Sequence, residues 1–269
     1  MDDLSADLTL ALELADMADR LTMEALESGA VEVTIKPDGS PVTNVDVAVE
    51  RSIRDLLAVR RPTDGIVGEE FGGESGGETA EGRQWILDPI DGTSSFARRG
   101  TVWGTLIALE IDRRPCVGVA SMPARGSRWW GAVGVGAFAS TPTQPEATPI
   151  TAASSGDETP LRCACVPAPE TLDGDERVTA DRLASLGRLV PYAEWTTYPP
   201  LMVADASLDA CLHMGAHWDV AALGAVVLAA GGAFHLDPAS RQDRTIALAT
   251  TKTHEAAALL ALGWPPPDS

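Results

Sequence analysis

The stretch Trp85-Ile-Leu-Asp88-Pro-Ile-Asp91-Gly-Thr93 decides how this chain folds and where its chemistry lies. An apolar strand ends before Pro89, which cannot continue a β-ladder, and Gly92 permits a tight turn. Asp88 and Asp91 should then project from one side of the turn. The amides of Gly92 and Thr93 form a corner suited to an anion. Two carboxylates and a bound anion can lie side by side only when a divalent cation between them offsets their repulsion.

Two other segments place carboxylates where strands stop, namely Gly68-Glu69-Glu70 and His217-Trp218-Asp219. Two carboxylates about 4–5 Å apart repel by roughly 3–4 kcal/mol at an effective dielectric near 20, so a cluster of four would bind protons or cations. Magnesium fits such a site because it prefers hard oxygen ligands and completes its shell with water and phosphate. A lone Asp-Pro-Ile-Asp-Gly is more often a simple turn, but the three segments together favour a metal site.

Composition limits the partners of the protein. Among 269 residues there are 39 acidic and 20 basic side chains, a net charge of −19. This excess disfavours nucleic acid polymers and anionic membrane surfaces, both of which select Lys and Arg. The four cysteines form neither a zinc motif nor a disulfide framework, which indicates a reducing compartment. The first residues lack a basic, apolar leader. We expect a cytoplasmic location.

The apolar periodicity predicts an α/β protein, which we divide into two halves, 1–145 and 146–269. The first half carries most of the candidate metal ligands, and the second carries Asp219. Residues 140–160 are expected to form a connector. Helices are predicted at 7–27, 44–60, 175–187, 199–206, 218–230 and 253–262. Strands are predicted at 31–35, 66–68, 84–87, 101–111, 116–122, 128–133, 137–139, 161–167, 189–192, 208–213, 233–236 and 245–250.

These motifs, in this order and spacing, resemble the inositol monophosphatase superfamily of magnesium-dependent, lithium-sensitive phosphatases. The resemblance begins at Lys36-Pro-Asp-Gly-Ser-Pro-Val-Thr43-Asn-Val-Asp46 and runs through the aspartate turn to the segment after Trp218. Actinobacterial histidinol-phosphate phosphatases look most similar, in GEEFGG, in Arg128-Trp129-Trp130 and in the segment Gly136–Ser140. The resemblance implies an αβαβα layered sandwich, phosphomonoesterase activity and a homodimer. It also implies that the half 146–269 carries the leaving-group pocket.

The resemblance also implies a role for each matching position. Two to three Mg²⁺ ions would be held by Glu69, Asp88, the Ile90 carbonyl, Asp91 and Asp219, with Asp88 bridging two of them. Asp46 would hydrogen-bond Thr93, and with Glu69 these residues would orient and deprotonate the attacking water. Gly92 and Thr93 would bind the phosphate through their amides. Such a metal clamp neutralises the charge on the transferring phosphoryl group.

The substrate positions depart from the family pattern. Ser95 replaces the Asn of the DGT-x-NF motif, which removes an amide near the start of a helix but no ligand. Relatives often place an acidic or small residue near His213, facing the leaving group. The residues that could contact substrate are Lys36, Ser94, Trp195, His213 and His217. A zinc site on His213 and His217 is disfavoured, because the two are expected in a strand-to-loop segment rather than on one helix.

The sequence therefore predicts hydrolysis of a small phosphate ester by in-line attack of an activated water. The substrate classes are histidinol phosphate, inositol phosphate or another polyol or sugar phosphate. One alternative is a nucleoside monophosphate, whose base could stack on Trp195 and Tyr198, or a specialised-metabolite phosphate. An alternative of another class is a catalytically silent binding or regulatory scaffold. Intact Glu69, Asp88, Asp91, Thr93 and Asp219 argue against a silent scaffold.

Overall fold

The computed structural model describes residues 4–74, 82–153, 160–237, 240 and 244–266. Its larger sheet has eight strands in the order β10-β9-β8-β7-β6-β5-β3-β4. All neighbouring strands are antiparallel except β3 and β5, which run parallel. The strands are β3 Gly65–Gly68, β4 Gly72–Glu74, β5 Arg83–Asp91, β6 Gly104–Ile111, β7 Arg114–Met122, β8 Ser127–Ala132, β9 Gly136–Thr141 and β10 Gln144–Ile150.

The smaller sheet has five strands in the order β12-β11-β13-β15-β14, with β11 parallel to both of its neighbours. A separate two-stranded hairpin, β1 Val33–Ile35 with β2 Pro41–Thr43, carries Lys36 in its turn. The strands of the smaller sheet are β11 Leu161–Val166, β12 Gly187–Leu189, β13 Ala210–Gly215, β14 Ala233–Leu236 and β15 Thr245–Thr250.

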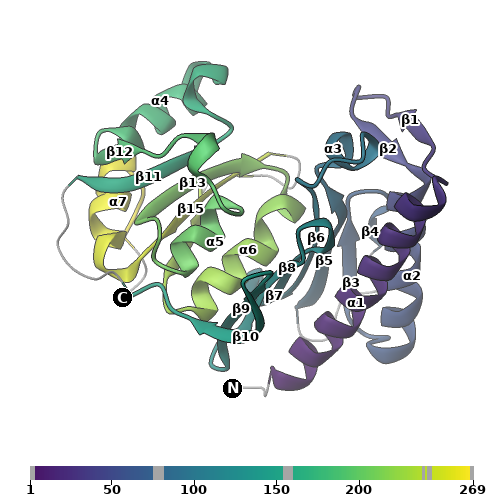
Figure 1. The fold of residues 1–269 in the computed structure, drawn as a ribbon. Coiled ribbons are helices and arrows are strands. Elements are labelled where there is room, and N and C mark those ends of the chain that lie inside the picture. The colour runs from purple at the N-terminus through teal and green to yellow at the C-terminus, as the bar shows by residue number, and fades with distance from the viewer. Residues whose placement is uncertain (1–3, 75–81, 154–159, 238–239, 241–243, 267–269) are drawn as a thin grey trace.

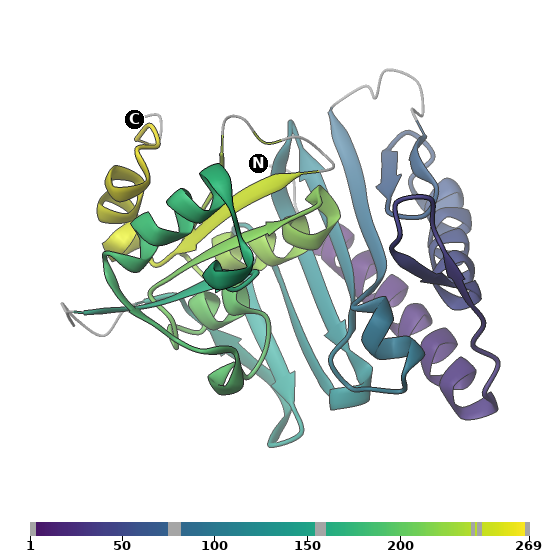
Figure 2. The same cartoon turned by 90° about the horizontal axis from the view of Figure 1, so that it is seen from above.

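The helices complete an αβαβα layered sandwich, which confirms the predicted fold class. Helices α1 and α2 cover one face of the larger sheet, α5 and α6 fill the space between the two sheets, and α4 and α7 lie outside the smaller sheet (Figures 1 and 2). The bounds are α1 Ser5–Ser28, α2 Asn44–Arg60, α3 Thr93–Ala97, α4 Gly174–Ala184, α5 Pro199–Ala204, α6 His217–Ala229 and α7 Glu255–Leu262.

Alternation along β5 explains how one strand serves two cores. Trp85 and Leu87 pack with α1 and α2, whereas Ile86 packs with α5 and α6. Side chains of a strand alternate between faces, so Asp88 lies on the same face as Ile86, toward α6. Helix α6 approaches this face closely, because Gly118 of β7 leaves room for the Ala222 carbonyl. The end of β5 and the start of α6 thus come together.

Most predicted helices and strands are formed within a few residues of their expected bounds. The connector prediction for 140–160 was wrong in part, because β10 lies there and extends the larger sheet. The strand predicted at 189–192 is formed two residues earlier, as β12. The division into halves at 145 and 146 stays a prediction, with its boundary inside β10. Among the described residues, no helix is long and apolar enough to cross a membrane.

Candidate active site

The turn after Asp88 is held by backbone constraints. The pairing of β5 with β6 shifts register between Asp88 and Asp91, and the Thr105 hydroxyl donates a 2.8 Å hydrogen bond to the Pro89 carbonyl. Gly92 adopts a φ of 86°, and a Cβ there would lie 2.8 Å from the Val102 carbonyl oxygen. Glycine is therefore required both by conformation and by space. The turn directs Asp91 and the first turn of α3 to one edge of the sheet.

Asp219 reaches the same place from the other side. It is the third residue of α6, and its Oδ2 accepts a 2.8 Å hydrogen bond from the Ala216 amide just before the helix. This contact fixes the carboxylate at the helix N-terminus, where negative charge is favoured. Asp88, Asp91 and Asp219 each offer an oxygen, and these three oxygens lie within 4.8 Å of one another.

Electrostatics shows that this cluster requires a proton or a cation. Burial, followed by the charge of Asp91, raises the pKa of Asp219 to about 7. Burial and the neighbouring carboxylates also raise the pKa values of Asp88 and Asp91. Asp88 Oδ1 is buried and has no hydrogen-bond partner among the described residues. An unpaired buried oxygen within three converging carboxylates fits a hard divalent cation.

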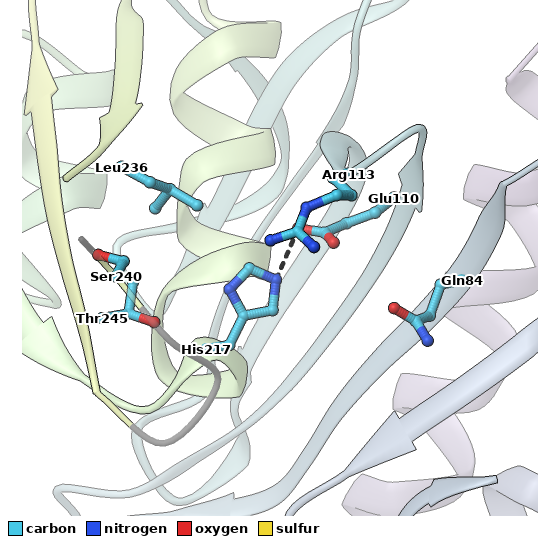
Figure 3. Close-up of a pocket in the computed structure, with 7 residues that line it drawn as sticks. All are labelled: Gln84, Glu110, Arg113, His217, Leu236, Ser240 and Thr245. Atoms are coloured by element: carbon cyan, nitrogen blue, oxygen red, sulfur yellow. Dashed lines mark hydrogen bonds and ion pairs between the residues drawn. The ribbon is translucent and has the colours of Figure 1, made fainter. Parts of the chain in front are cut away.

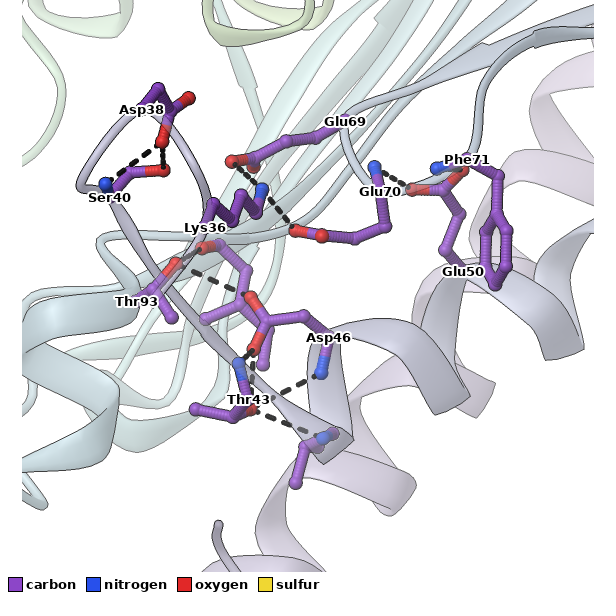
Figure 4. A network of polar contacts seen from close by, with 12 residues as sticks. Lys36, Asp38, Ser40, Thr43, Asp46, Glu50, Glu69, Glu70, Phe71 and Thr93 are labelled. Carbon is purple, nitrogen blue, oxygen red and sulfur yellow. Dashed lines mark hydrogen bonds and ion pairs between the residues drawn. The ribbon is translucent and has the colours of Figure 1, made fainter. Parts of the chain in front are cut away.

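Asp46 and Thr93 form the contact expected of them (Figure 4). The Thr93 hydroxyl lies 3.3 Å from Asp46 Oδ1 and 3.1 Å from the Ile90 carbonyl oxygen. Asp46 is the third residue of α2, and its Oδ2 accepts from the amide and the hydroxyl of Thr43, which caps the helix. Burial raises the pKa of the Asp46 carboxyl. The helix cap thus holds Asp46 in place beside Thr93.

Lys36 contacts both Glu69 and Glu70 at the edge of the site. Lys36 Nζ is 2.8 Å from Glu69 Oε1 and 2.8 Å from Glu70 Oε1 (Figure 4). Burial alone would lower the pKa of Lys36, but hydrogen bonds to both glutamates outweigh it and raise that pKa. Burial raises the pKa of Glu70 to about 7 despite the lysine. Glu69 is therefore paired with Lys36 and lies outside the close cluster of three aspartates.

Glu50 is a supporting residue that the sequence interpretation missed. It is fully buried on α2, where its carboxylate accepts from the Glu70 amide at 2.8 Å and from the Phe71 amide at 3.3 Å (Figure 4). It also accepts from Arg54 Nε at 2.8 Å. A Cβ on Gly68 would collide with this carboxylate. Its signal in the sequence is an acidic residue four positions after Asp46 and four before Arg54, on one helix face.

Tyr198 is a second residue whose role in the site was missed. Its hydroxyl donates a 2.7 Å hydrogen bond to Asp91 Oδ2 across 107 positions of sequence. Burial and the Asp91 charge raise the pKa of the Tyr198 phenol well above its usual value, so it remains a donor. The sequence interpretation considered this ring only for stacking. No local pattern identifies the contact.

The substrate candidates separate in space. Trp195 and His213 line a cavity of about 390 Å³ beside Asp91. Ser94 is exposed on α3. His217 instead lies 2.9 Å from Glu110, in a separate cavity of about 60 Å³, and its ring points toward Glu110 and Arg113 in Figure 3. His213 lies in β13 and His217 begins α6, and the described residues show no metal-binding group that includes either histidine.

Comparisons with known proteins identify the family. Residues 3–261 match the inositol monophosphatase family. The chain belongs to the inositol monophosphatase family. It is 41% identical over 228 residues to a histidinol-phosphatase of Mycobacterium tuberculosis, covering 84% of this chain and 85% of the relative. It is 37% identical over 247 residues to a histidinol-phosphatase of Streptomyces coelicolor, covering 87% of this chain and 88% of the relative.

A solved inositol monophosphatase from Zymomonas mobilis superposes with a TM-score of 0.72 and 25% identity, covering 98% of this chain and 100% of that one. Membership in the inositol monophosphatase family and the two histidinol-phosphatase relatives make this chain a phosphoric monoester hydrolase. The family is metal-dependent, and the aspartate cluster supplies oxygen ligands of the appropriate kind. The predicted family and reaction class are confirmed.

Proposed function

We propose that this chain hydrolyses a small phosphate monoester with two to three Mg²⁺ ions held by Glu69, Asp88, the Ile90 carbonyl, Asp91 and Asp219. The observation that carries the proposal is the convergence of one oxygen each from Asp88, Asp91 and Asp219 within 4.8 Å of one another, in a cluster where Asp88 Oδ1 has no hydrogen-bond partner among the described residues. Glu69 would exchange its contact with Lys36 for a cation. Magnesium, when bound, lowers the pKa of a water and neutralises phosphoryl charge.

Backbone amides and side chains of the protein would bind the phosphate, orient the attacking water and accept its proton. The amides of Gly92, just before α3, and of Thr93, its first residue, have no acceptor within the helix and would bind the phosphate oxygens. Thr93 and Glu69 would orient the attacking water. Its proton would pass by way of the Thr93 hydroxyl to Asp46, to which that hydroxyl is already hydrogen-bonded. Water would attack phosphorus in line as the ester bond breaks, the leaving alkoxide would take up a proton from a solvent water, and Asp46 would release its proton to solvent before the next turnover.

The substrate set includes histidinol phosphate, because two relatives are named histidinol-phosphatases. It also includes inositol phosphate and other polyol or sugar phosphates. A nucleoside monophosphate or a specialised-metabolite phosphate is a second candidate, favoured by the aromatic lining that Tyr192 and Trp195 give the cavity beside Asp91. A silent scaffold is disfavoured, because all predicted metal ligands and Thr93 are retained.

A phosphate-release screen tests the proposal. The purified chain would be offered p-nitrophenyl phosphate, histidinol phosphate, inositol phosphates, sugar phosphates and nucleoside monophosphates, with millimolar Mg²⁺ or with a chelator. We expect turnover only with the metal, and inhibition by millimolar Li⁺. If no phosphate is released from any of these esters, enzymatic function is contradicted. Full turnover in chelator would contradict the magnesium assignment.

We further propose a homodimer and a cytoplasmic location. All four cysteines are free, and burial raises the pKa of the Cys163 and Cys165 thiols to about 12, so these thiols stay protonated and unreactive. This state suits a reducing compartment. Sedimentation velocity would measure the mass in solution, and a monomer at micromolar concentration would contradict the dimer.

A further inference from the structure

The cavity beside Asp91 is the space next to the proposed phosphate site. It has a volume of about 390 Å³ and lies between the two sheets. Asp91, one of its lining residues, accepts a hydrogen bond from the Tyr198 hydroxyl. A leaving group attached to a phosphate at the cluster would enter this cavity. Its walls are Asp91, Val102, Met122, Arg125, Val166, Tyr192, Ala193, Trp195, Thr197, Tyr198, Pro199 and His213.

One wall is a fixed aromatic surface. Trp195 Nε1 donates a 3.0 Å hydrogen bond to the Val190 carbonyl, which fixes the indole. The Tyr192 ring packs edge-on against it, with centroids 5.2 Å apart and planes at 68°. Met122 of β7 and Val102, two residues before β6, add apolar surface. A flat or apolar leaving group would contact this wall.

The charges of the cavity are asymmetric. Asp91 is the one acidic residue among the lining residues, and its carboxylate is already committed to the cluster and to Tyr198. Arg125 is the one permanent cation of the lining. Its Nη1 donates to the Thr196 carbonyl at 3.1 Å, and within the described part of the chain no carboxylate pairs with it.

His213 adds a neutral polar group to this cavity. Only 8% of the residue is exposed, and its Nδ1 is buried without a hydrogen-bond partner among the described residues. Burial lowers the pKa of His213 to about 4, so the ring is uncharged at neutral pH. A ligand would thus meet a neutral imidazole and an unpaired guanidinium, with no free carboxylate to compensate an ammonium group.

We propose, on the basis of the proposed phosphatase function, that this cavity selects a leaving group that is uncharged or anionic beside His213 and Arg125 and rejects one that carries an ammonium group there. The preferred substrates are phosphate esters of aromatic or apolar alcohols, with or without a carboxylate. Within the proposed substrate set, histidinol phosphate, whose leaving group carries an ammonium group, therefore ranks below phosphate esters of uncharged or carboxylate-bearing alcohols. A carboxylate would pair with Arg125, whereas an ammonium group would lose its hydration without gaining a partner.

A matched series of substrates tests the inference. Three phosphate esters of 3-(imidazol-4-yl)propanol would differ only at carbon 2, which carries hydrogen, an ammonium group (histidinol phosphate itself) or a carboxylate. We expect kcat/KM for the ammonium ester to be at least tenfold below that for the hydrogen ester, and the carboxylate ester to equal or exceed the hydrogen ester. The inference is overturned if the ammonium ester is the best of the three.

Variants locate the selectivity. Arg125→Gln should reduce the ratio of carboxylate to hydrogen ester by about tenfold, and His213→Glu should raise the ratio of ammonium to hydrogen ester by a similar factor. Arg188→Gln is the matched control, because Arg188 is exposed, pairs with Glu194 and does not line the cavity. If the ratio of kcat/KM for the carboxylate ester to that for the hydrogen ester is unchanged in Arg125→Gln, the role of Arg125 is contradicted. This test stands even if His213→Glu does not fold.

A binding measurement separates this inference from the proposed function. Titration calorimetry would compare the three unphosphorylated alcohols on the metal-loaded protein in the presence of inorganic phosphate. If none of the esters is hydrolysed but the alcohols bind in the expected order, the phosphatase proposal fails and the cavity inference holds. If the esters are hydrolysed but the aminoalcohol binds most tightly, the phosphatase proposal holds and the cavity inference fails.

Discussion

The hydroxyl of Tyr198 donates a 2.7 Å hydrogen bond to Asp91 Oδ2, and thereby joins the segment before α5 to the end of β5. Asp91 belongs to the aspartate cluster, and Tyr198 also lines the adjoining cavity. A Cβ on Gly104 would lie 3.1 Å from this hydroxyl, so the neighbouring strand leaves space for it. One hydrogen bond therefore connects the cavity to the proposed metal ligands.

Tyr198→Phe should weaken magnesium binding. Hydrogen bonds from a second residue orient a metal-binding carboxylate, and their loss usually changes metal affinity or activity by about 10- to 100-fold. We expect the Mg²⁺ concentration for half-maximal phosphate release to rise roughly tenfold. Magnesium titration of the activity and of the thermal stability measures the effect. Tyr192→Phe is the control, and an unchanged magnesium dependence in Tyr198→Phe would show that the contact does not position Asp91.

Asp88→Asn should lower activity and raise the stability of the metal-free protein. The substitution removes a proposed bridging charge, so we expect turnover to fall by roughly a thousandfold or more. It also removes one of several buried carboxylates that repel one another, and the melting temperature in chelator should rise by a few degrees. Asp55→Asn, on the exposed face of α2, is the control. Near-normal activity in Asp88→Asn would reject the metal assignment.

The resemblance of the motifs predicted the layered fold, and runs of apolar residues predicted most of its helices and strands. Helix α6 and strand β5 are examples, since most residues of each are buried. Strand β10 was missed for a physical reason. Its residues are mostly exposed and it pairs only with β9 at the sheet edge, so no apolar alternation marks it.

The site was predictable where chemistry and local sequence coincide. Asp88, Asp91 and Asp219 converge as expected, and Thr93 contacts Asp46. The contacts of Tyr198 and of His217 depend on long-range packing. His217 faces Glu110 at a distance of 2.9 Å because α6 begins there, and no spacing in the sequence shows which face of the helix start is turned to the cluster.

Lys36→Met should strengthen magnesium binding. Lys36 Nζ lies 2.8 Å from Glu69 Oε1, so its ammonium group competes with a cation for this carboxylate. Removing a positive charge a few ångströms from the site should lower the half-maximal Mg²⁺ concentration by roughly three- to tenfold at high effective dielectric. Calorimetric titration with Mg²⁺ measures it, with Lys252→Met as the control because Lys252 pairs with Glu255 on another element. Weaker magnesium binding in Lys36→Met would instead show that the lysine helps to hold Glu69 in place.

The metal-free protein should lose stability as the pH rises from 6.5 to 8. Burial raises the pKa of Asp219 and of Glu70 to about 7, and also raises that of Asp88. In the unfolded chain these carboxyls are already ionised at pH 6.5, so the folded state binds more protons over this interval. Stability must then fall with increasing pH. His213, whose pKa is lowered to about 4, acts in the opposite direction, but its imidazole in the unfolded chain is already half deprotonated at pH 6.5, so above that pH it contributes at most about 0.4 kcal/mol.

Thermal melts in chelator at pH 6.5, 7.25 and 8 would measure this slope, and we expect a decrease of a few degrees. Asp219→Asn should flatten it, because the amide carries no proton that is lost over the interval. Saturating Mg²⁺ should flatten it as well, since a bound cation replaces those protons. Asp55→Asn should leave the slope as in the unmodified chain. A melting temperature in chelator that rises with pH would mean that these carboxyls are already ionised at pH 6.5, and it would remove the electrostatic reason for a cation in the cluster.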